Sequence, residues 1–244
     1  MKTALITGGA VRLGRAIALA LADAGHDVVI HHRSSAEAAT ALAAEIRARG
    51  RQAWTLRADL ADADAVAGLV GEATALAGPL TLLVNNASIF PTGSLSGLDA
   101  ASLAENLQVN ALAPHALAEA FVAQADPDRD PNIIHLLDSR VIDFDTGHVA
   151  YHLSKRALLS LTRLGADGYA PAVRVNAVAP GPVLPPPDKD EAYLADRGAE
   201  VPLARAGCAA DVADAVLYLT HATFVTGQIL YIDGGRHLQG NRYA

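Results

Sequence analysis

The sequence predicts an α/β protein built on a doubly wound, parallel, seven-stranded sheet with helices on both faces. Short β-branched runs alternate along the chain with longer segments rich in Ala and Leu, which is typical of βαβ units. The first of these runs ends in a glycine-rich turn. Together these features favour an open Rossmann-type sheet over an eight-stranded barrel. The 244 residues fit a single domain.

Strands and helices are expected to alternate in order along this domain. Residues 180–207 break the alternation, because they begin with several closely spaced prolines. We expect them to form a substrate loop that covers the site, with a plain surface insertion as the alternative. Residues 238–244 are expected to form a C-terminal tail. The expected strands are residues 3–7, 27–32, 52–57, 81–85, 132–137, 174–178 and 228–232, and the expected helices are residues 13–24, 36–49, 63–76, 101–125, 149–169 and 210–220.

The composition argues against several classes of partner. A formal net charge of −7 disfavours a nonspecific hold on nucleic acid, which requires clustered Lys and Arg. No apolar run reaches membrane-spanning length, and the first residues lack a signal-peptide core. Cys208 is the only cysteine, and the nine histidines suggest no metal site; we interpret His148 and His152 as helix surface or site rim. The expectation is a cytoplasmic protein that binds small molecules, without nucleic acid, membrane or metal.

A phosphate-binding turn is expected where the first strand meets the first helix. Residues 7–14 read TGGAVRLG, so Gly8 and Gly14 let the backbone approach a pyrophosphate. The helix that begins near Arg12 and Leu13 adds free N–H groups and a favourable dipole. These four residues are predicted cofactor contacts, and a tight turn without a ligand is the alternative.

The residues after the second strand decide between NADH and NADPH. No acidic residue ends this strand, whereas Arg33 offers a guanidinium to a 2′-phosphate, flanked by His32 and Ser34. The pattern predicts NADPH, with Arg33 on a solvated face as the alternative.

Two further strand ends supply predicted cofactor contacts. Asp59 and Leu60 follow the third strand, although Asp59 is equally suited to capping a helix. Asn86, Ala87 and Ser88 follow the fourth strand at the carboxyl edge of the sheet, where open α/β folds bind ligands.

Tyr151 and Lys155 form the predicted proton-delivery pair. They lie four residues apart on the expected helix 149–169 and therefore project from one face. The pKa of a free tyrosine is about 10, and we expect the adjacent ammonium to lower it, so that Tyr151 exchanges a proton as a nicotinamide delivers hydride. Asn110 is a third candidate, because Pro114 lacks the N–H that would bond the Asn110 carbonyl. That carbonyl could hold a water beside Lys155, with a simple helix kink as the alternative.

In order and spacing these motifs resemble the short-chain dehydrogenase/reductase family over residues 3 to about 238. The resemblance implies a homotetramer. It also implies cofactor contacts from Tyr151, Lys155, Pro180 and Gly181.

Two departures from the family pattern narrow the resemblance. Arg12 replaces the middle glycine of the turn, and Asp138 stands where the family has its catalytic serine, with Ser139 one residue out of register. Both departures are similar to the pteridine reductases and the bacterial dihydromonapterin reductases. This resemblance implies a pterin-like substrate held by Arg12, Ser88, Phe90, Asp138 and Tyr151, with Phe90 stacked on the pterin. Phe90 as an ordinary core or lid residue is the alternative.

Asp138 also has an independent chemical rationale. Ketone reduction develops an alkoxide, which a carboxylate repels, whereas a C=N nitrogen gains a proton and positive character, which a carboxylate stabilises. We therefore expect NADPH-dependent reduction of a dihydropterin, such as dihydromonapterin, dihydrobiopterin or dihydrofolate, to its tetrahydro form. One alternative is a carbonyl reductase such as a 3-oxoacyl carrier-protein reductase, with Ser139 in the serine role. Another is a nonenzymatic NADPH-sensing protein.

Overall fold

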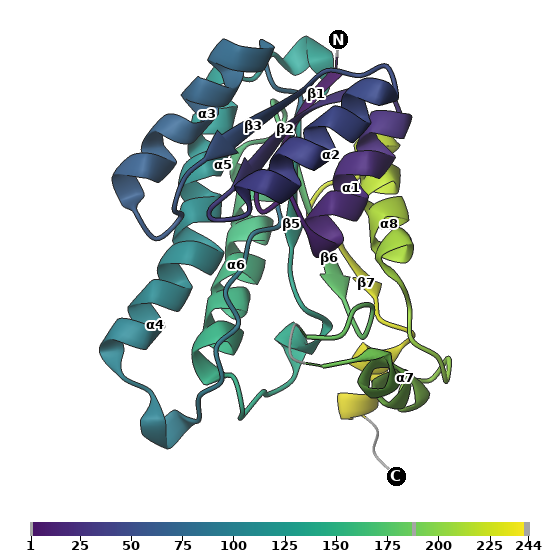
Figure 1. Ribbon diagram of the computed structural model, residues 1–244. Coiled ribbons are helices and arrows are strands. Elements are labelled where there is room, and N and C mark those ends of the chain that lie inside the picture. The colour runs from purple at the N-terminus through teal and green to yellow at the C-terminus, as the bar shows by residue number, and fades with distance from the viewer. Residues whose placement is uncertain (1, 187–188, 242–244) are drawn as a thin grey trace.

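The sheet is parallel and seven-stranded, as predicted. The computed structural model describes residues 2–186 and 189–241, and its strands follow the order β3-β2-β1-β4-β5-β6-β7 (Figure 1). Every neighbouring pair of strands is parallel. The winding reverses between β1 and β4, and such a switch point is where doubly wound sheets bind ligands. The strands are β1 (Lys2–Ile6), β2 (His26–His32), β3 (Ala53–Arg57), β4 (Leu82–Asn85), β5 (Asn132–Leu136), β6 (Arg174–Pro180) and β7 (Ile229–Ile232).

Helices cover both faces of the sheet (Figure 1). One layer contains α1, α2 and α8, and the other contains α3, α5 and α6, with α4 packed against α6. The helices are α1 (Arg12–Asp23), α2 (Ala36–Ala48), α3 (Ala63–Ala77), α4 (Ala100–Leu107), α5 (Ala113–Gln124), α6 (Val149–Gly168), α7 (Glu191–Ala199) and α8 (Ala209–His221).

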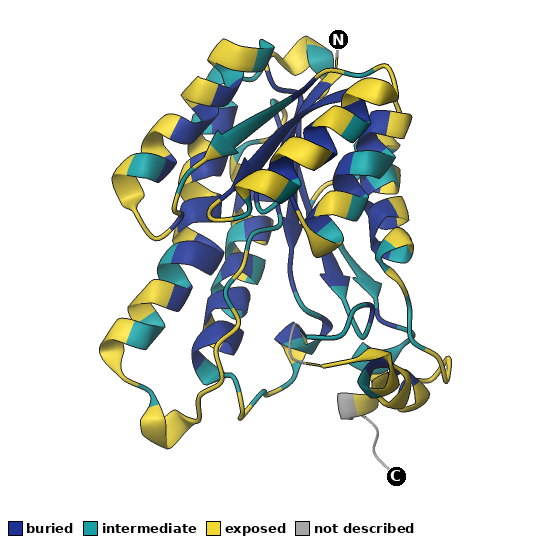
Figure 2. Cartoon of the chain, viewed as in Figure 1, coloured by how far each residue is buried: buried dark blue, intermediate teal, exposed yellow. Residues whose placement is uncertain are grey.

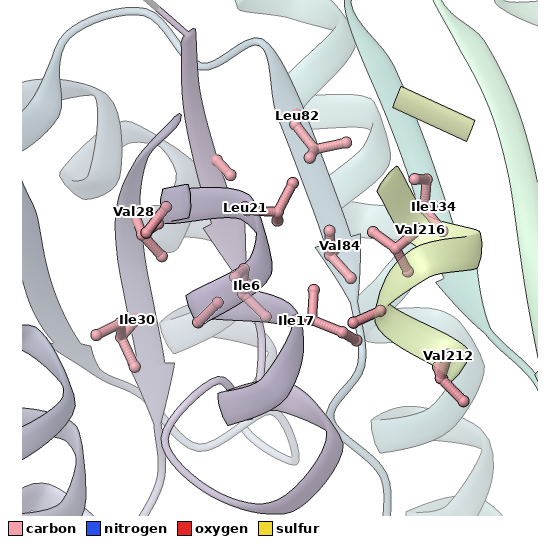
Figure 3. Packing of buried hydrophobic residues seen from close by; sticks show 14 of the residues in the cluster. Ile6, Ile17, Leu21, Val28, Ile30, Leu82, Val84, Ile134, Val212 and Val216 are labelled. Atoms are coloured by element: carbon pink, nitrogen blue, oxygen red, sulfur yellow. The ribbon is translucent and has the colours of Figure 1, made fainter. Parts of the chain in front are cut away.

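Alternation along each strand fills both hydrophobic layers. In β1, Ile6 packs into the layer of α1 and α8, whereas the adjacent Leu5 packs into the layer of α3 and α5. Figure 3 shows the first layer, in which Ile17 of α1 and Val216 of α8 lie over the strands. Because helices cover both faces, β2 and β5 are buried throughout their length and β1 is buried except at Lys2 (Figure 2). The sheet is therefore a rigid base for the loops at its carboxyl edge.

Two predicted segments differ from the structure. The helix predicted over residues 101–125 consists of α4 and α5 joined by a π turn at Gln108–Leu112, a local widening that hydrophobic periodicity does not reveal. The segment 180–207, predicted as a loop, contains α7, because Asp190 caps a helix there by accepting from the N–H of Tyr193. Residues 187–188 of that segment and residues 242–244 of the expected tail lie outside the described residues.

Asp59 does not cap a helix, contrary to the alternative considered above. Asp62 caps α3 instead, since its side chain accepts from the N–H groups of Asp64 and Ala65. Asp59 is left on the loop that follows β3, with its side chain accepting from the N–H of Ala61.

A buried histidine lies at the opposite, amino-terminal edge of the sheet. His26 begins β2, and neither of its ring nitrogens has a hydrogen-bond partner within the described ranges. Burial, together with the nearby charge of Lys2, lowers the pKa of His26 from 6.5 to about 4.

We predict that His26→Leu makes the protein less sensitive to acid. The unfolded chain takes up this proton near pH 6.5 and the folded protein only near pH 4, so the free energy of unfolding falls as the pH drops through that window. Between pH 7 and pH 5 the loss is about 2 kcal/mol for a shift of this size. Urea unfolding at both pH values should show a smaller loss for the variant; an equal loss in both proteins contradicts the prediction.

Candidate active site

A cavity of about 470 Å³ opens where the strands β1 to β6 end. Its wall contains every residue predicted to contact the cofactor except Lys155, which is buried beside Tyr151. Of the remaining candidates, Asp138 lines the cavity, whereas Asn110 and Phe90 do not. The predicted residues on the wall are Gly8, Arg12, Leu13, Gly14, His32, Arg33, Ser34, Asp59, Leu60, Asn86, Ala87, Ser88, Asp138, Tyr151, Pro180 and Gly181.

The turn between β1 and α1 leaves no room for a side chain at its glycines. A Cβ atom on Gly14 would lie 2.2 Å from the carbonyl oxygen of Gly8. Gly8 itself has a φ of 60°, and Arg12 has a φ of 54° although it is not a glycine. The backbone is thus free to approach a ligand closely, as a pyrophosphate at the start of a helix requires. This cradle fits the dinucleotide predicted from the sequence.

His31 supports this turn, and the sequence analysis did not single it out. Its Nδ1 accepts from the N–H of Gly8 at 3.2 Å, while its Nε2 lies 3.1 Å from the carbonyl oxygen of Ala58. The two contacts place the ring proton on Nε2. Burial lowers the pKa of His31 to about 4, so the ring is neutral near pH 7. A polar ring at the end of a buried strand, next to a glycine-rich turn, was the available signal.

Asn86 holds the turn from the other side. Its side-chain amide donates to the carbonyls of Thr7 and Gly8. The hydroxyl of Thr7 accepts from the backbone N–H groups of Asn86 and Ala87. The segment after β4 is therefore bound to the phosphate turn, so these residues shape the cavity as well as line it.

His32, Arg33 and Ser34 form one end of the cavity. Burial and the nearby charge of Arg57 lower the pKa of His32, which is neutral near pH 7. The guanidinium of Arg57 donates to the carbonyl of Arg33 and so fixes the backbone of this segment. Arg33 is exposed on the cavity wall, where its guanidinium can meet an anionic group.

Tyr151 and Asp138 meet at the centre of the site. The Tyr151 hydroxyl donates to Oδ2 of Asp138 at 3.1 Å. Burial, reinforced by the Asp138 carboxylate, raises the pKa of Tyr151 well above 10.0. The lowering expected from Lys155 is wrong for this structure, because the Lys155 ammonium donates to the carbonyl of Leu136 at 2.7 Å and burial lowers its own pKa to about 8. Tyr151 is therefore a neutral phenol that can donate a proton.

Asn110 braces the site through its side chain. Its Oδ1 accepts from the N–H of Ile89 at 2.9 Å and from the hydroxyl of Ser88 at 3.1 Å. Its Nδ2 donates to the hydroxyl of Ser154, which in turn donates to the carbonyl of Tyr151 at 2.6 Å. The π turn that carries Asn110 thus connects the cavity wall to α6. The water-holding role of its backbone carbonyl stays a hypothesis.

Phe90 stands beside the cavity with 42% of its surface exposed. Its ring stacks on His148 at a centroid distance of 4.0 Å and meets the Tyr151 ring edge-on at 4.5 Å. One face of the Phe90 ring is therefore covered by His148. His148 is half-buried, whereas His152 is buried, contrary to its interpretation as helix surface or site rim.

The segment after β6 closes the cavity on its remaining side. A Cβ atom on Gly181 would lie 2.6 Å from Cα of Asp233, so only glycine fits there. The guanidinium of Arg12 donates to the carbonyl of Pro185 at 2.6 Å. This bond connects the phosphate turn to the proline-rich segment across the cavity.

Neither a metal-binding cluster nor a membrane-spanning helix is found along the described part of the chain. No cluster of three or more His, Cys, Asp or Glu side chains that could bind a metal occurs within residues 2–186 and 189–241. None of the helices in those ranges combines the length and apolar character needed to cross a bilayer.

We predict that Gly14→Ala weakens NADPH binding by about tenfold or more, because the new methyl group must displace the Gly8 carbonyl. Gly71→Ala is the matched control, since Gly71 also lies in a helix and a Cβ there meets nothing within 4 Å. The control should bind NADPH normally and melt at the same or a higher temperature. Titration of NADPH fluorescence measures both affinities, and equal affinities would show that the tight turn is not part of the binding site.

Comparison with known proteins supports a reductase. The family model described as enoyl-(acyl carrier protein) reductase matches residues 9–237. An uncharacterized oxidoreductase of Mycobacterium tuberculosis is 38% identical over 96% of this chain and 91% of its own. A 3-oxoacyl-[acyl-carrier-protein] reductase, FabG, of Staphylococcus aureus is 32% identical over 97% of this chain and 98% of its own.

Solved structures give a further likeness. FolM alternative dihydrofolate reductase 1 from Brucella canis, complexed with NADP, superposes with a TM-score of 0.91 and 37% identity, covering 97% of this chain and 94% of its own. The FolM protein of Brucella suis, also in complex with NADP, gives a TM-score of 0.93 at 37% identity, covering 97% of this chain and 95% of its own. Given these matches across nearly the whole chain, the protein belongs to the short-chain dehydrogenase/reductase family.

Proposed function

We propose that the protein is an NADPH-dependent reductase of a dihydropterin or dihydrofolate C=N bond. The observation that carries this proposal is the Asp138 carboxylate, which lies on the cavity wall and accepts the hydroxyl hydrogen of Tyr151. A carboxylate at this point favours a nitrogen that becomes cationic and disfavours an oxygen that becomes anionic. The likeness to FolM dihydrofolate reductases supports the same substrate class.

The cavity walls suit NADPH, and the relatives complexed with NADP support this assignment. When bound, NADPH supplies the hydride. The phosphate turn from Gly8 to Gly14 would hold the pyrophosphate, and Arg33 with its neighbours His32 and Ser34 would hold the 2′-phosphate.

Tyr151 would supply the proton to the ring nitrogen of the substrate. Its raised pKa keeps it a neutral phenol, and Asp138 stabilises the positive character of the nitrogen as the N–H bond forms. Lys155, with a pKa of about 8, exchanges protons readily near neutral pH and lies beside the Tyr151 ring. The substrate carbon gains hydride and the nitrogen gains a proton, so one C=N bond becomes a saturated C–N bond.

A carbonyl reductase is the second candidate, favoured by the likeness to FabG proteins and to the enoyl reductase model. For that activity, Ser139 would have to act as the family's catalytic serine. Ser139 is buried and is not on the cavity wall, so its hydroxyl is poorly placed to meet a substrate oxygen. A nonenzymatic NADPH sensor would not need the connected set of Tyr151, Lys155, Asp138 and Asn110.

We predict that the protein oxidises NADPH with dihydromonapterin or dihydrofolate and does so far more slowly with an acetoacetyl thioester. Steady-state absorbance at the NADPH maximum measures both rates. Turnover of the thioester alone would reject the pterin proposal, and tight NADPH binding without any turnover would favour a sensor.

Two variants sharpen this test. Asp138→Asn is close in size to aspartate and removes the charge, and it should lower kcat for the dihydropterin by about a hundredfold or more. Ser139→Ala is the neighbouring control and should leave kcat within about twofold, because Ser139 lies off the cavity wall. A larger loss of kcat in Ser139→Ala than in Asp138→Asn would show that Ser139, and not Asp138, takes part in the reaction.

We predict that Arg33→Ala weakens NADPH binding by about tenfold or more, since a charged hydrogen bond to the 2′-phosphate is lost. NADH binding should be unchanged, because NADH has no 2′-phosphate. Arg49→Ala serves as the control, because Arg49 pairs with Asp23 and Glu45 away from the cavity. Equal losses for NADPH and NADH would contradict this role for Arg33.

A further inference from the structure

Arg140 lies next to the proposed proton-delivery group, and neither the sequence analysis nor the mechanism above gives it a role. It belongs to a 3-10 turn, Ser139–Ile142, that follows β5. Its backbone N–H donates to Oδ1 of Asp138 at 2.8 Å, and its side-chain Nε lies 3.4 Å from the same oxygen. Oδ2 of Asp138 is the atom that accepts from Tyr151. The two carboxylate oxygens are thus divided between Arg140 and Tyr151, which fixes the direction of the carboxylate.

A second carboxylate balances the guanidinium. Nη1 of Arg140 lies 2.6 Å from Oδ2 of Asp145, whose side chain is almost fully buried. Burial alone raises the pKa of Asp145, but the charge of Arg140 and the hydrogen bond from His148 outweigh it, so this pKa lies below 3.8. Burial alone lowers the pKa of Arg140, but the two carboxylates outweigh this effect and raise the pKa above its ordinary value. Arg140 is therefore a permanent cation between two carboxylates.

The same cation connects the carboxylate to the aromatic wall. The guanidinium carbon of Arg140 lies 5.7 Å from the centre of the Phe90 ring, within range of a cation–π interaction. Phe90 stacks on His148, and His148 is held by Asp145. The groups that substrate would meet on this side, Asp138 and Phe90, are thus both in contact with Arg140.

Among the described residues, Arg140 is the only cationic side chain within hydrogen-bond distance of the Asp138 carboxylate. Helix α6 presents Tyr151, Lys155, His152 and Arg156 towards this region. Of these, Lys155 is bonded to a backbone carbonyl and Arg156 to the carbonyls of Ile142 and Asp143. Loss of the Arg140 charge would leave two carboxylates beside a buried phenol, which strongly favours uptake of a proton.

We infer that Arg140 is a positioning residue that balances the charge of the Asp138 carboxylate and directs it at the Tyr151 hydroxyl. The inference rests on the role proposed above for Asp138. It assigns to Arg140 no contact with the reacting atoms. Its effect on kcat is assigned to Asp138, so that effect should vanish when Asp138 is neutral, whereas its contact with Phe90 would act on KM.

The test compares Arg140→Gln, Arg140→Lys and the control Arg156→Gln. The Arg156 guanidinium donates to the carbonyls of Ile142 and Asp143 in the same loop. It lies 5.1 Å from the centre of the Phe144 ring and does not contact Asp138. Loss of loop order alone would therefore affect the Arg140 and Arg156 variants alike. The backbone hydrogen bond to Asp138 is kept in Arg140→Gln and Arg140→Lys, because it comes from the main-chain N–H.

We predict that Arg140→Gln lowers kcat for the dihydropterin by about tenfold or more, with a smaller change in KM, and moves the acidic limb of its pH profile to higher pH. Removing the cation makes protonation of the carboxylate easier, which gives this sign. Arg140→Lys should recover part of the rate, because it keeps the charge, and Arg156→Gln should keep the pH profile of the unaltered protein. Equal pH profiles for Arg140→Gln and Arg156→Gln would overturn the inference.

Two readouts separate this inference from the proposed function. In the Asp138→Asn background, Arg140→Gln should cause no further loss of kcat, and an additive loss would show that Arg140 acts elsewhere. Carbon-13 NMR of labelled aspartate, with Asp138 assigned through Asp138→Asn, follows the carboxylate without any substrate. Its proton should bind at a higher pH in Arg140→Gln than in the unaltered protein, and an unchanged titration would overturn the inference even if dihydropterin is turned over. Absence of dihydropterin turnover by the unaltered protein would instead reject the proposed function.

Discussion

The Tyr151 hydroxyl oxygen lies 3.1 Å from Oδ2 of Asp138, just after β5 ends, and the rest of the site holds these two groups in place. The contact needs a protonated phenol and an ionised carboxylate in a partly buried setting, which is costly unless other groups compensate the charge. Arg140 compensates on one side, and Lys155 lies behind the Tyr151 ring on the other. The sheet makes this possible, because parallel strands deliver β5 and the loops around it to one edge, while α6 carries Tyr151 across that edge.

The supports of this pair are made from separate parts of the fold. The π turn between α4 and α5 presents Asn110 to the segment after β4 and to Ser154 on α6. A regular helix would place the Asn110 side chain in a different direction, so the π turn is what brings Asn110 to these partners. On the cofactor side, neutral His31 and the Asn86 amide hold the phosphate turn with backbone hydrogen bonds. Neither depends on a bound ligand.

Much of this arrangement could be predicted from the sequence, for reasons that can be stated residue by residue. The hydrophobic periodicity predicted the sheet, and the turn TGGAVRLG predicted its ligand-binding edge, because both signals are local in the sequence. Asp138 was recognised because its position relative to Tyr151 departs from the family pattern. His31 and Arg140 were missed, because their roles depend on partners 23 residues away or on a charge balance that only the folded chain creates. The direction of the Tyr151 pKa was wrong for the same reason: burial and a carboxylate outweigh a lysine whose ammonium is bonded elsewhere.

Arg12 combines two properties that normally exclude one another. Its backbone occupies a region that costs a non-glycine residue roughly 1–2 kcal/mol, yet its side chain spans the cavity to the carbonyl of Pro185. Reverting this position to glycine would relax the backbone and cut the tether in the same step, and the two effects on the free energy of unfolding have opposite signs. A variant with unaltered thermal stability would thus still have lost the bond between the phosphate turn and Pro185, so a melting temperature does not report what this arginine contributes.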